Sequence, residues 1–81
     1  MTQAGCAWAK YLADSSELAE KVMDEQMPAA VEGNSNAALV VELARSTVLL
    51  TRVLRAVRMP SDGDRRILAR KRATLEALLA R

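Results

Sequence analysis

The sequence predicts an all-α fold: a three-helix bundle or helical hairpin with a long central helix, completed by homo-oligomerisation. Hydrophobic residues make up 51% of the chain but aromatic residues only 2%, so the apolar content is mostly Ala, Leu and Val, which is typical of helices. These residues recur at steps of three and four, the spacing that places side chains on one face of a helix. Turn-forming residues concentrate in two stretches, 33–36 and 60–63, which separate three long segments.

The length of the chain limits how it can be organised. With 81 residues, we expect one helical domain over residues 1–81. A chain of this size buries only about 60% of the surface that its unfolded form exposes. A core of Ala and Leu with little aromatic volume is marginal alone, and oligomerisation is a usual remedy. We therefore expect the chain to bind itself, as a homodimer or a larger assembly.

The first predicted helix covers residues 3–31, and Pro28 predicts a kink or an early stop near its end. Asp14 and Glu17 resemble a capping box, which leaves open a break at residue 14. A continuous apolar stripe favours one helix instead. The members of this stripe are Ala4, Trp8, Tyr11, Ser15, Leu18 and Val22.

The central helix, predicted over residues 37–59, contains neither Gly nor Pro. Its first half is apolar on nearly every side, which indicates cover on more than one face. One stripe keeps the helical spacing throughout and is the strongest burial signal in the chain. We call it the predicted stripe and expect neighbouring helices, some from a second copy, to cover it. The predicted stripe consists of Leu39, Leu43, Ser46, Leu50, Val53 and Val57.

Two short connections join the predicted helices. In the loop at 33–36, Gly33 suits a left-handed cap for the first helix, and Ser35 or Asn36 can cap the second. At the turn 60–63, Pro60 ends the central helix because the residue before a proline is disfavoured in helical geometry.

The last predicted helix covers residues 62–81, and Ser61 with Asp64 forms a capping box at its start. Lys71 falls inside its apolar arc, so we expect the aliphatic stem to be buried and the ammonium to reach solvent. The residues predicted to be buried are Ile67, Leu68, Leu75, Leu78 and Leu79.

The residues that commonly carry chemistry are scarce. The sequence has no His, which removes the commonest general base and metal ligand, and its one Cys cannot build a zinc site. Asp62 and Asp64 cap a helix, since the residues after them lack the further oxygen ligands of a calcium loop. We therefore expect no catalytic, cofactor-binding or metal-binding residues, and no enzymatic activity.

Charge is unevenly distributed along the chain. The first 36 residues carry two Lys against six Asp and Glu, for a net charge of −4, whereas the rest carry ten Lys and Arg against four Asp and Glu, for +6. The arginines around the second turn are candidate contacts for an anionic partner such as nucleic acid. The alternative is a solvated face with salt bridges to the acidic first helix, which the net charge of only +2 and the lack of nearby aromatic residues favour. The candidate arginines are Arg52, Arg55, Arg58, Arg65, Arg66, Arg70 and Arg72.

The function predicted from these features is that of a small, non-enzymatic helical module that binds another protein or itself. It would be a regulator, inhibitor or assembly factor, of a size also found in phages and mobile elements. The alternative is a nucleic-acid-associated oligomeric accessory subunit that packages or binds DNA through the Arg-rich turn. The candidate interface consists of Trp8, Tyr11, Leu18, Val22, Leu39, Leu43, Leu50, Val53 and Val57.

Cellular location is inferred from two features. The single Cys6 suggests a reducing compartment. The most apolar stretch is interrupted by Glu42 and Arg45, so it falls short of the roughly 18 apolar residues that a membrane span needs. We expect a soluble cytoplasmic protein with no membrane partner.

Overall fold

The computed structural model describes the backbone of residues 3–57 and 59–79, and the side chains from residue 7 onward within those ranges. Three helices follow one another: α1 (Gln3–Val31), α2 (Ser35–Ala56) and α3 (Asp62–Leu79). No strand occurs in the described ranges, so the prediction of an all-α fold is confirmed. Ala4 and Cys6 precede the described side chains, and Arg58 and Arg81 lie outside the described residues.

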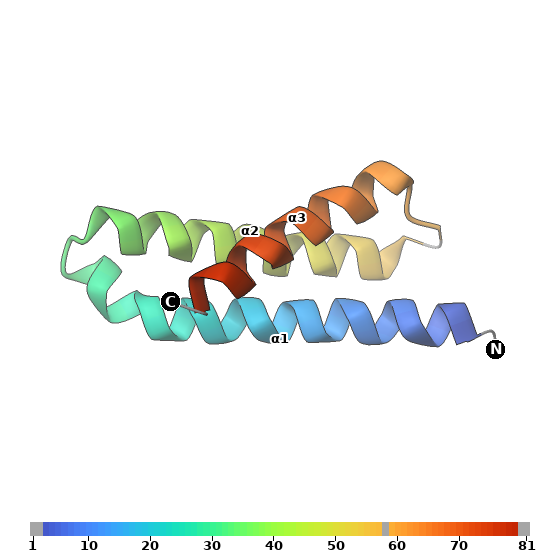
Figure 1. Cartoon of the computed structure of the whole chain (residues 1–81), viewed down its shortest axis with the longest axis horizontal. Coiled ribbons are helices and arrows are strands. Elements are labelled where there is room, and N and C mark those ends of the chain that lie inside the picture. Colours follow the sequence, from blue (N-terminus) through green and yellow to red (C-terminus); the bar gives the residue numbers. More distant parts are fainter. Residues whose placement is uncertain (1–2, 58, 80–81) are drawn as a thin grey trace.

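The helices form an elongated bundle that measures 46 × 19 × 16 Å. α1 and α2 run antiparallel along most of their lengths, and α3 folds back diagonally over both (Figure 1). The 29 residues of α1 account for the long dimension, because a helix rises about 1.5 Å per residue. α1 and α2 make the most extensive contact of the three pairs.

The end of α1 is a Schellman motif centred on Gly33. Gly33 has a φ of 98°, in the left-handed region that favours glycine. Its amide donates to the carbonyl of Ala30 at 3.1 Å, and the amide of Asn34 donates to the carbonyl of Ala29 at 3.0 Å. These two bonds satisfy carbonyls that a helix end leaves free. The predicted left-handed cap is therefore confirmed.

α2 begins two residues before its predicted start. Its cap is Asn34, whose side-chain oxygen accepts a hydrogen bond from the amide of Ala37 at 3.0 Å. The prediction that Ser35 or Asn36 is the cap is wrong. Because the amide of Asn34 also makes the outer hydrogen bond of the Schellman motif, one residue ends the first helix and starts the second.

α1 is continuous through both positions at which the sequence suggested an interruption. At the first, the hydroxyl of Ser15 donates to the carbonyl of Tyr11 at 2.7 Å, a bond within the helix. At the second, Pro28 lies inside the helix and the amide of Glu32 donates to its carbonyl at 3.1 Å. The early stop is therefore wrong. The last turns of α1 bend towards α2 (Figure 1).

α2 ends at Ala56, three residues before its predicted end at Met59. Val57 is extended, with φ −89° and ψ 128°, and its amide donates to the carbonyl of Leu54 at 3.2 Å. Proline restricts the residue immediately before it. The helix therefore stops earlier than Pro60 alone requires.

The start of α3 is the predicted capping box. The amide of Asp64 donates to the hydroxyl of Ser61 at 3.1 Å, and the amide of Ser61 donates to the carboxylate of Asp64 at 3.3 Å. Asp62 and Asp64 also lie in the first helical turn, where negative charge is favourable. Their position at a helix cap accounts for both acids.

The core consists of two apolar clusters. The cluster nearer the N-terminus of α1 contains Leu12, Leu54 and Leu68, and the other contains Ala19, Val22, Ala44, Val48 and Leu75. Three hydroxyl side chains are buried beside them, and each donates to a carbonyl of its own helix at 2.6–2.8 Å. These bonds remove the penalty of burying a free hydroxyl. The three residues are Ser15, Thr47 and Thr51.

The predicted stripe is not the buried face of α2 within this chain. Of its members, Leu43, Ser46 and Leu50 are half-buried, while Leu39 and Val53 are 69% and 60% exposed. The buried face is rotated away from it, and small side chains on that face let α1 approach closely. The buried residues of α2 are Ala37, Val41, Ala44, Thr47, Val48, Thr51 and Leu54.

The prediction for α3 is also partly wrong. Leu68 and Leu75 are fully buried, and Leu78 is half-buried. Ile67 is 51% exposed and Leu79 is exposed as well. α3 lies diagonally across the other two helices (Figure 1). Its buried residues, Leu68 and Leu75, are seven positions apart and therefore lie on one line along the helix.

We expect opposite effects from the same substitution at two glycines. Gly33→Ala should destabilise the fold by about 1–2 kcal/mol, because an L-residue at a left-handed φ is strained. Gly63→Ala should stabilise it by about 0.5 kcal/mol, because Gly63 lies in α3 and an added Cβ meets only the Ser61 hydroxyl oxygen, at 3.7 Å. Urea unfolding of both variants measures the difference. Equal effects of the two substitutions would contradict the assigned cap.

Candidate functional site

The strongest candidate site is an apolar face that α2 turns away from α1. We call it the outer face of α2 and define it by Leu39, Glu42, Ser46, Leu49 and Val53. The separations of seven residues from 39 to 46 to 53, and from 42 to 49, keep these side chains on one side of a helix. Leu39, Leu49 and Val53 are all more than half exposed. The exposed aliphatic residues therefore follow one line along the helix.

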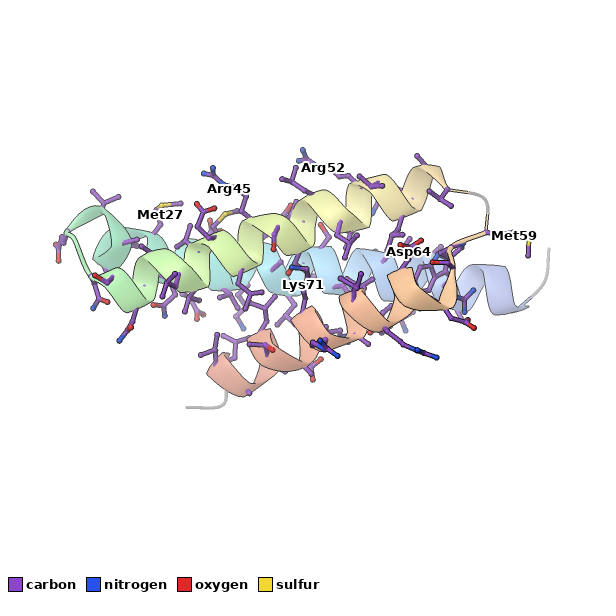
Figure 2. All side chains as sticks on the ribbon, turned by 90° about the horizontal axis from the view of Figure 1, so that it is seen from above. Met27, Arg45, Arg52, Met59, Asp64 and Lys71 are labelled. Atoms are coloured by element: carbon purple, nitrogen blue, oxygen red, sulfur yellow. The ribbon has the colours of Figure 1, made fainter. Side chains whose placement is uncertain are left out.

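Charged side chains border this face on both sides. Arg45 and Arg52 project from the side of α2 that faces away from α3, and Lys71 of α3 lies on the other side (Figure 2). The ammonium of Lys71 donates to the hydroxyl of Ser46 at 3.0 Å. The ammonium was expected to reach solvent, and the structure shows that it also bonds to a residue of α2. The outer face is thus apolar along its middle, with cations at its edges and one acid, Glu42, within it.

The apolar surface continues from α2 onto α3. The bond between Lys71 and Ser46 sets the register of the two antiparallel helices. Ile67, one turn before Lys71, therefore lies beside the part of α2 that follows Ser46. Ile67 and Val57 are both exposed. Exposed aliphatic side chains therefore occur on α3, and just after the end of α2, as well as on the outer face.

The structure does not bring the nine candidate interface residues onto one surface. Tyr11, Trp8 and Leu50 pack against the cluster of Leu12, Leu54 and Leu68. Three further candidates pack against the second cluster or belong to it: Leu18, Val22 and Leu43. The remaining three are exposed in this chain: Leu39, Val53 and Val57.

Sequence reasoning missed Leu49 and Ile67 as members of the exposed surface. Leu49 lies outside the predicted stripe, and Ile67 was expected in the core. The signal for Leu49 was present, because it lies four residues before Val53 and seven after Glu42. No comparable signal existed for Ile67, since its exposure depends on the angle at which α3 crosses α2.

An aromatic pair on α1 holds two of the candidate arginines. The rings of Trp8 and Tyr11 are stacked, with centroids 5.8 Å apart. The guanidinium carbon of Arg65 lies 4.9 Å from the Trp8 centroid, and that of Arg72 lies 4.7 Å from the Tyr11 centroid. Such cation–π contacts contribute about 0.5–1 kcal/mol when exposed. The prediction that no aromatic residues lie near the arginines is therefore wrong, because the fold brings Trp8 and Tyr11 of α1 next to two arginines of α3.

Arg72 makes further bonds that attach α3 to α1. It donates to the Glu76 carboxylate at 2.8 Å and to the hydroxyl of Ser15 at 3.3 Å. The hydrogen bond to Glu76 raises the pKa of Arg72 above its ordinary value, despite an opposing effect of burial. Within residues 3–57 and 59–79 no ion pair joins α3 to α1, so the predicted salt bridges between them are absent there. The arginines instead contact α1 through aromatic rings and a hydroxyl.

The other candidate arginines have a different environment. Arg52, Arg55, Arg66 and Arg70 are exposed, and Arg58 lies outside the described residues. The candidate arginines therefore differ in what they contact: Arg65, which is also exposed, and Arg72 lie over aromatic rings of α1, and the other four described ones are divided between α2 and α3.

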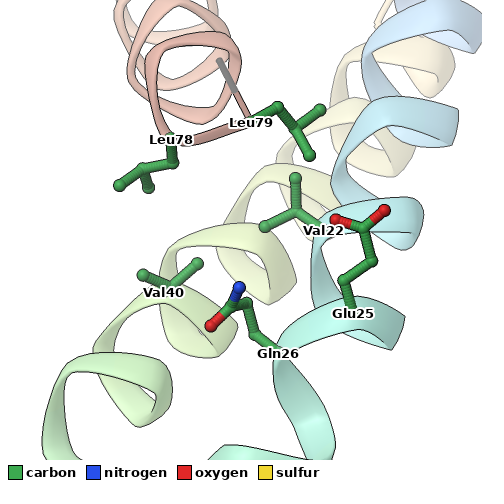
Figure 3. Close-up of a pocket in the computed structure, with 6 residues that line it drawn as sticks. All are labelled: Val22, Glu25, Gln26, Val40, Leu78 and Leu79. Atoms are coloured by element: carbon green, nitrogen blue, oxygen red, sulfur yellow. The ribbon is translucent and has the colours of Figure 1, made fainter. Parts of the chain in front are cut away.

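A pocket of about 360 Å³ opens where the end of α3 crosses α1 and α2 (Figure 3). Four of its six lining residues are aliphatic, and the polar side chains of Glu25 and Gln26 lie at its α1 side. Across the described part of the chain, no three His, Cys, Asp or Glu side chains are grouped as metal ligands. The lining residues are Val22, Glu25, Gln26, Val40, Leu78 and Leu79.

One further property bears on the choice of partner. Among the helical residues that the structure describes, none belongs to a segment both long enough and apolar enough to cross a bilayer. The exposed aliphatic residues of α2 share their helix with the exposed charged side chains of Glu42, Arg45 and Arg52.

Substitution of Trp8 tests the role of the aromatic pair. Its indole nitrogen is buried and finds no acceptor among the described residues, which costs about 1–3 kcal/mol. We expect Trp8→Phe to be close to neutral, because it removes the unsatisfied donor and keeps a ring over which Arg65 can lie. Trp8→Ala should destabilise the fold by about 2 kcal/mol or more. Chemical denaturation distinguishes these outcomes, and equal losses would show that the ring contacts contribute little.

Comparisons with protein-family models, with curated proteins and with solved structures find no match for this chain. The outer face of α2, with its line of exposed aliphatic residues and its charged borders, is therefore the feature from which a function can be inferred.

Proposed function

We propose that this chain is a small, non-enzymatic helical protein-binding module of the cytoplasm, which acts as a regulator, inhibitor or assembly factor. The observation that carries the proposal is the line of exposed Leu39, Leu49 and Val53 on one face of α2. Apolar side chains that are scattered singly over a surface are ordinary, but a contiguous apolar surface with a polar rim is typical of an interaction site. Burying one such side chain completely stabilises a complex by about 1.5–3 kcal/mol.

The use of the buried polar groups supports a binding role over a catalytic one. Ser15, Thr47 and Thr51 are buried, and each hydroxyl donates to a carbonyl of its own helix. Arg72, the polar side chain with the most partners, joins α1 to α3. These groups stabilise the bundle, and the exposed part of α2 is left with aliphatic surface for recognition.

Self-association belongs to the same proposal. The two core clusters are small and contain Ala, Val and Leu, with rings only at the edge of one. A chain of 81 residues has little apolar burial to spare, so aliphatic residues left in water are an unused source of stability. Burying the outer face against a second copy would add this missing stability.

Photocrosslinking tests the proposed binding face. With p-benzoylphenylalanine in place of Val53, we expect discrete protein adducts in an extract of the source cell, or an adduct with a second copy. The control carries the same group in place of Val31, which is 77% exposed at the end of α1 and is not a member of the outer face. Adducts of equal yield at both positions, or at neither, would contradict the proposal.

A salt titration against duplex DNA tests the competing function, a nucleic-acid-associated subunit. We expect no binding at low salt, because Arg65 and Arg72 contact aromatic rings of α1 and the remaining arginines do not form a single patch. Fluorescence anisotropy of a labelled duplex is the measurement. Micromolar binding that weakens steeply as salt rises would favour the nucleic-acid function over protein binding.

A further inference from the structure

We propose that the partner on the outer face of α2 is a second copy of this chain, packed antiparallel across a two-fold axis that passes close to Ser46. This inference rests on the proposed function, since it names the partner of the same face. It goes beyond self-association in general, because it assigns the contacting helix, its direction and its register.

The spacing of the aliphatic residues is self-complementary about Ser46. Leu39 lies seven residues before Ser46 and Val53 seven residues after it. In an antiparallel pair related by a two-fold axis at position 46, Leu39 of each copy therefore lies opposite Val53 of the other. Both side chains are more than half exposed in the single chain. The two-fold rotation that covers Leu39 of each copy therefore also covers Val53 of each copy.

A small residue at the axis allows the two helices to approach closely. Ser46 has a short side chain, and its hydroxyl already donates to the carbonyl of Leu43 at 2.8 Å and accepts from Lys71 at 3.0 Å. Covering the Ser46 hydroxyl leaves no unsatisfied group on that residue. The Lys71 ammonium that bonds it is a second cation near the axis, and it lies on the flank opposite Arg45. The residue at the centre of the proposed contact is thus compatible with close helix packing.

The charges on the outer face select the antiparallel direction. A two-fold axis at Ser46 places Glu42 level with position 50 of the other copy, so Arg52 is only about 3 Å further along at 1.5 Å per residue. Helical spacing puts Glu42 and Arg52 on the same flank, and this operation keeps each flank facing itself. Two reciprocal Glu42–Arg52 pairs result. A parallel pair would instead put this flank on opposite sides of the interface in the two copies, and Glu42 and Arg52 would lie about 15 Å apart along the helices, so neither pair would form.

Arg45 lies near the axis on the same flank and would approach Arg45 of the second copy. Its side chain is exposed and projects away from α3 (Figure 2). Two exposed cations at the edge of an interface remain in water, where solvent and salt weaken their repulsion. We expect burial of the aliphatic residues and the two Glu42–Arg52 pairs to stabilise the dimer by more than this repulsion between the two Arg45 side chains destabilises it.

Charge reversal tests the register. Glu42→Arg alone and Arg52→Glu alone should each raise the Kd of the dimer by about tenfold, because like charges then meet at two places. An equimolar mixture of the two variants should restore the dimer, since positions 42 and 52 carry opposite charges in the mixed pair. Light scattering reports the mass, which is 8.8 kDa for one chain. Circular dichroism confirms that each variant remains helical. Failure of the mixture to recover would overturn the register.

Disulfide trapping tests the direction of the helices. In a Cys6→Ser background, a mixture of the Leu39→Cys and Val53→Cys chains should form a mixed disulfide. Leu39→Cys alone should not crosslink, because the two copies of position 39 are about 21 Å apart along the antiparallel pair. Self-crosslinking of Leu39→Cys would show a parallel pair and overturn the inference.

A further outcome separates this inference from the proposed function. A wild-type chain that stays monomeric in light scattering at millimolar concentration would overturn the second copy as the partner. The proposed function would stand in that case if the crosslinker at position 53 captured a different protein. It would fail together with the inference if position 53 captured nothing.

Discussion

The antiparallel packing of α1 against α2 is the constraint on which the rest of this structure depends. Ala19 of α1 and Ala44 of α2 are both fully buried, and they let the two helices approach closely. The buried hydroxyls of Ser15 and Thr51 lie on the same facing surfaces and bond to their own helices. Because this face of α2 packs against α1, the opposite face of α2 is exposed to solvent. The exposed line of aliphatic residues is thus a direct consequence of how the first two helices meet.

α3 is attached by a different combination of forces. α3 contributes one fully buried leucine to each apolar cluster, and these two residues join the two parts of the core. Leu68 belongs to the cluster with Leu12 and Leu54, and Leu75 belongs to the other cluster. Arginines on its α1 side lie over Trp8 and Tyr11. Guanidinium groups suit this position, because they are planar, weakly hydrated and able to stack on a ring while they hydrogen-bond at their edge. Part of the Arg-rich segment therefore has a structural role that does not require an anionic partner.

The proposed dimer follows from a shortage of cover within a small chain. α2 is apolar on nearly every side of its first half, but only α1 and the diagonal α3 are available to pack against it. A helix that is apolar all round normally has neighbours on several faces. A second copy of α2 supplies the missing neighbour with the same residues, and Glu42 and Arg52 add direction to an association that aliphatic contacts alone would leave unspecified.

Features of this fold that depend on a few consecutive residues could be predicted without the tertiary structure. The positive φ at Gly33 and the reciprocal bonds of Ser61 and Asp64 were predictable, because each cap is formed by groups within about five positions of one another. The number of helices followed from the same signals. The candidate interface was only partly predictable, since Leu39 and Val53 were identified and Leu49 was not.

Which face of α2 is buried, and what the arginines contact, depends instead on how the three helices pack together. A helix with aliphatic residues on most of its circumference has no single apolar face, so periodicity alone selected a stripe that is rotated from the buried one. Small and hydroxyl-bearing residues, which count weakly in a hydrophobic pattern, line the buried face because they pack closely and satisfy their own hydrogen bonds. The contact of Arg72 with Ser15 joins residues that are 57 positions apart in the sequence, and a local sequence pattern cannot predict a contact over that separation.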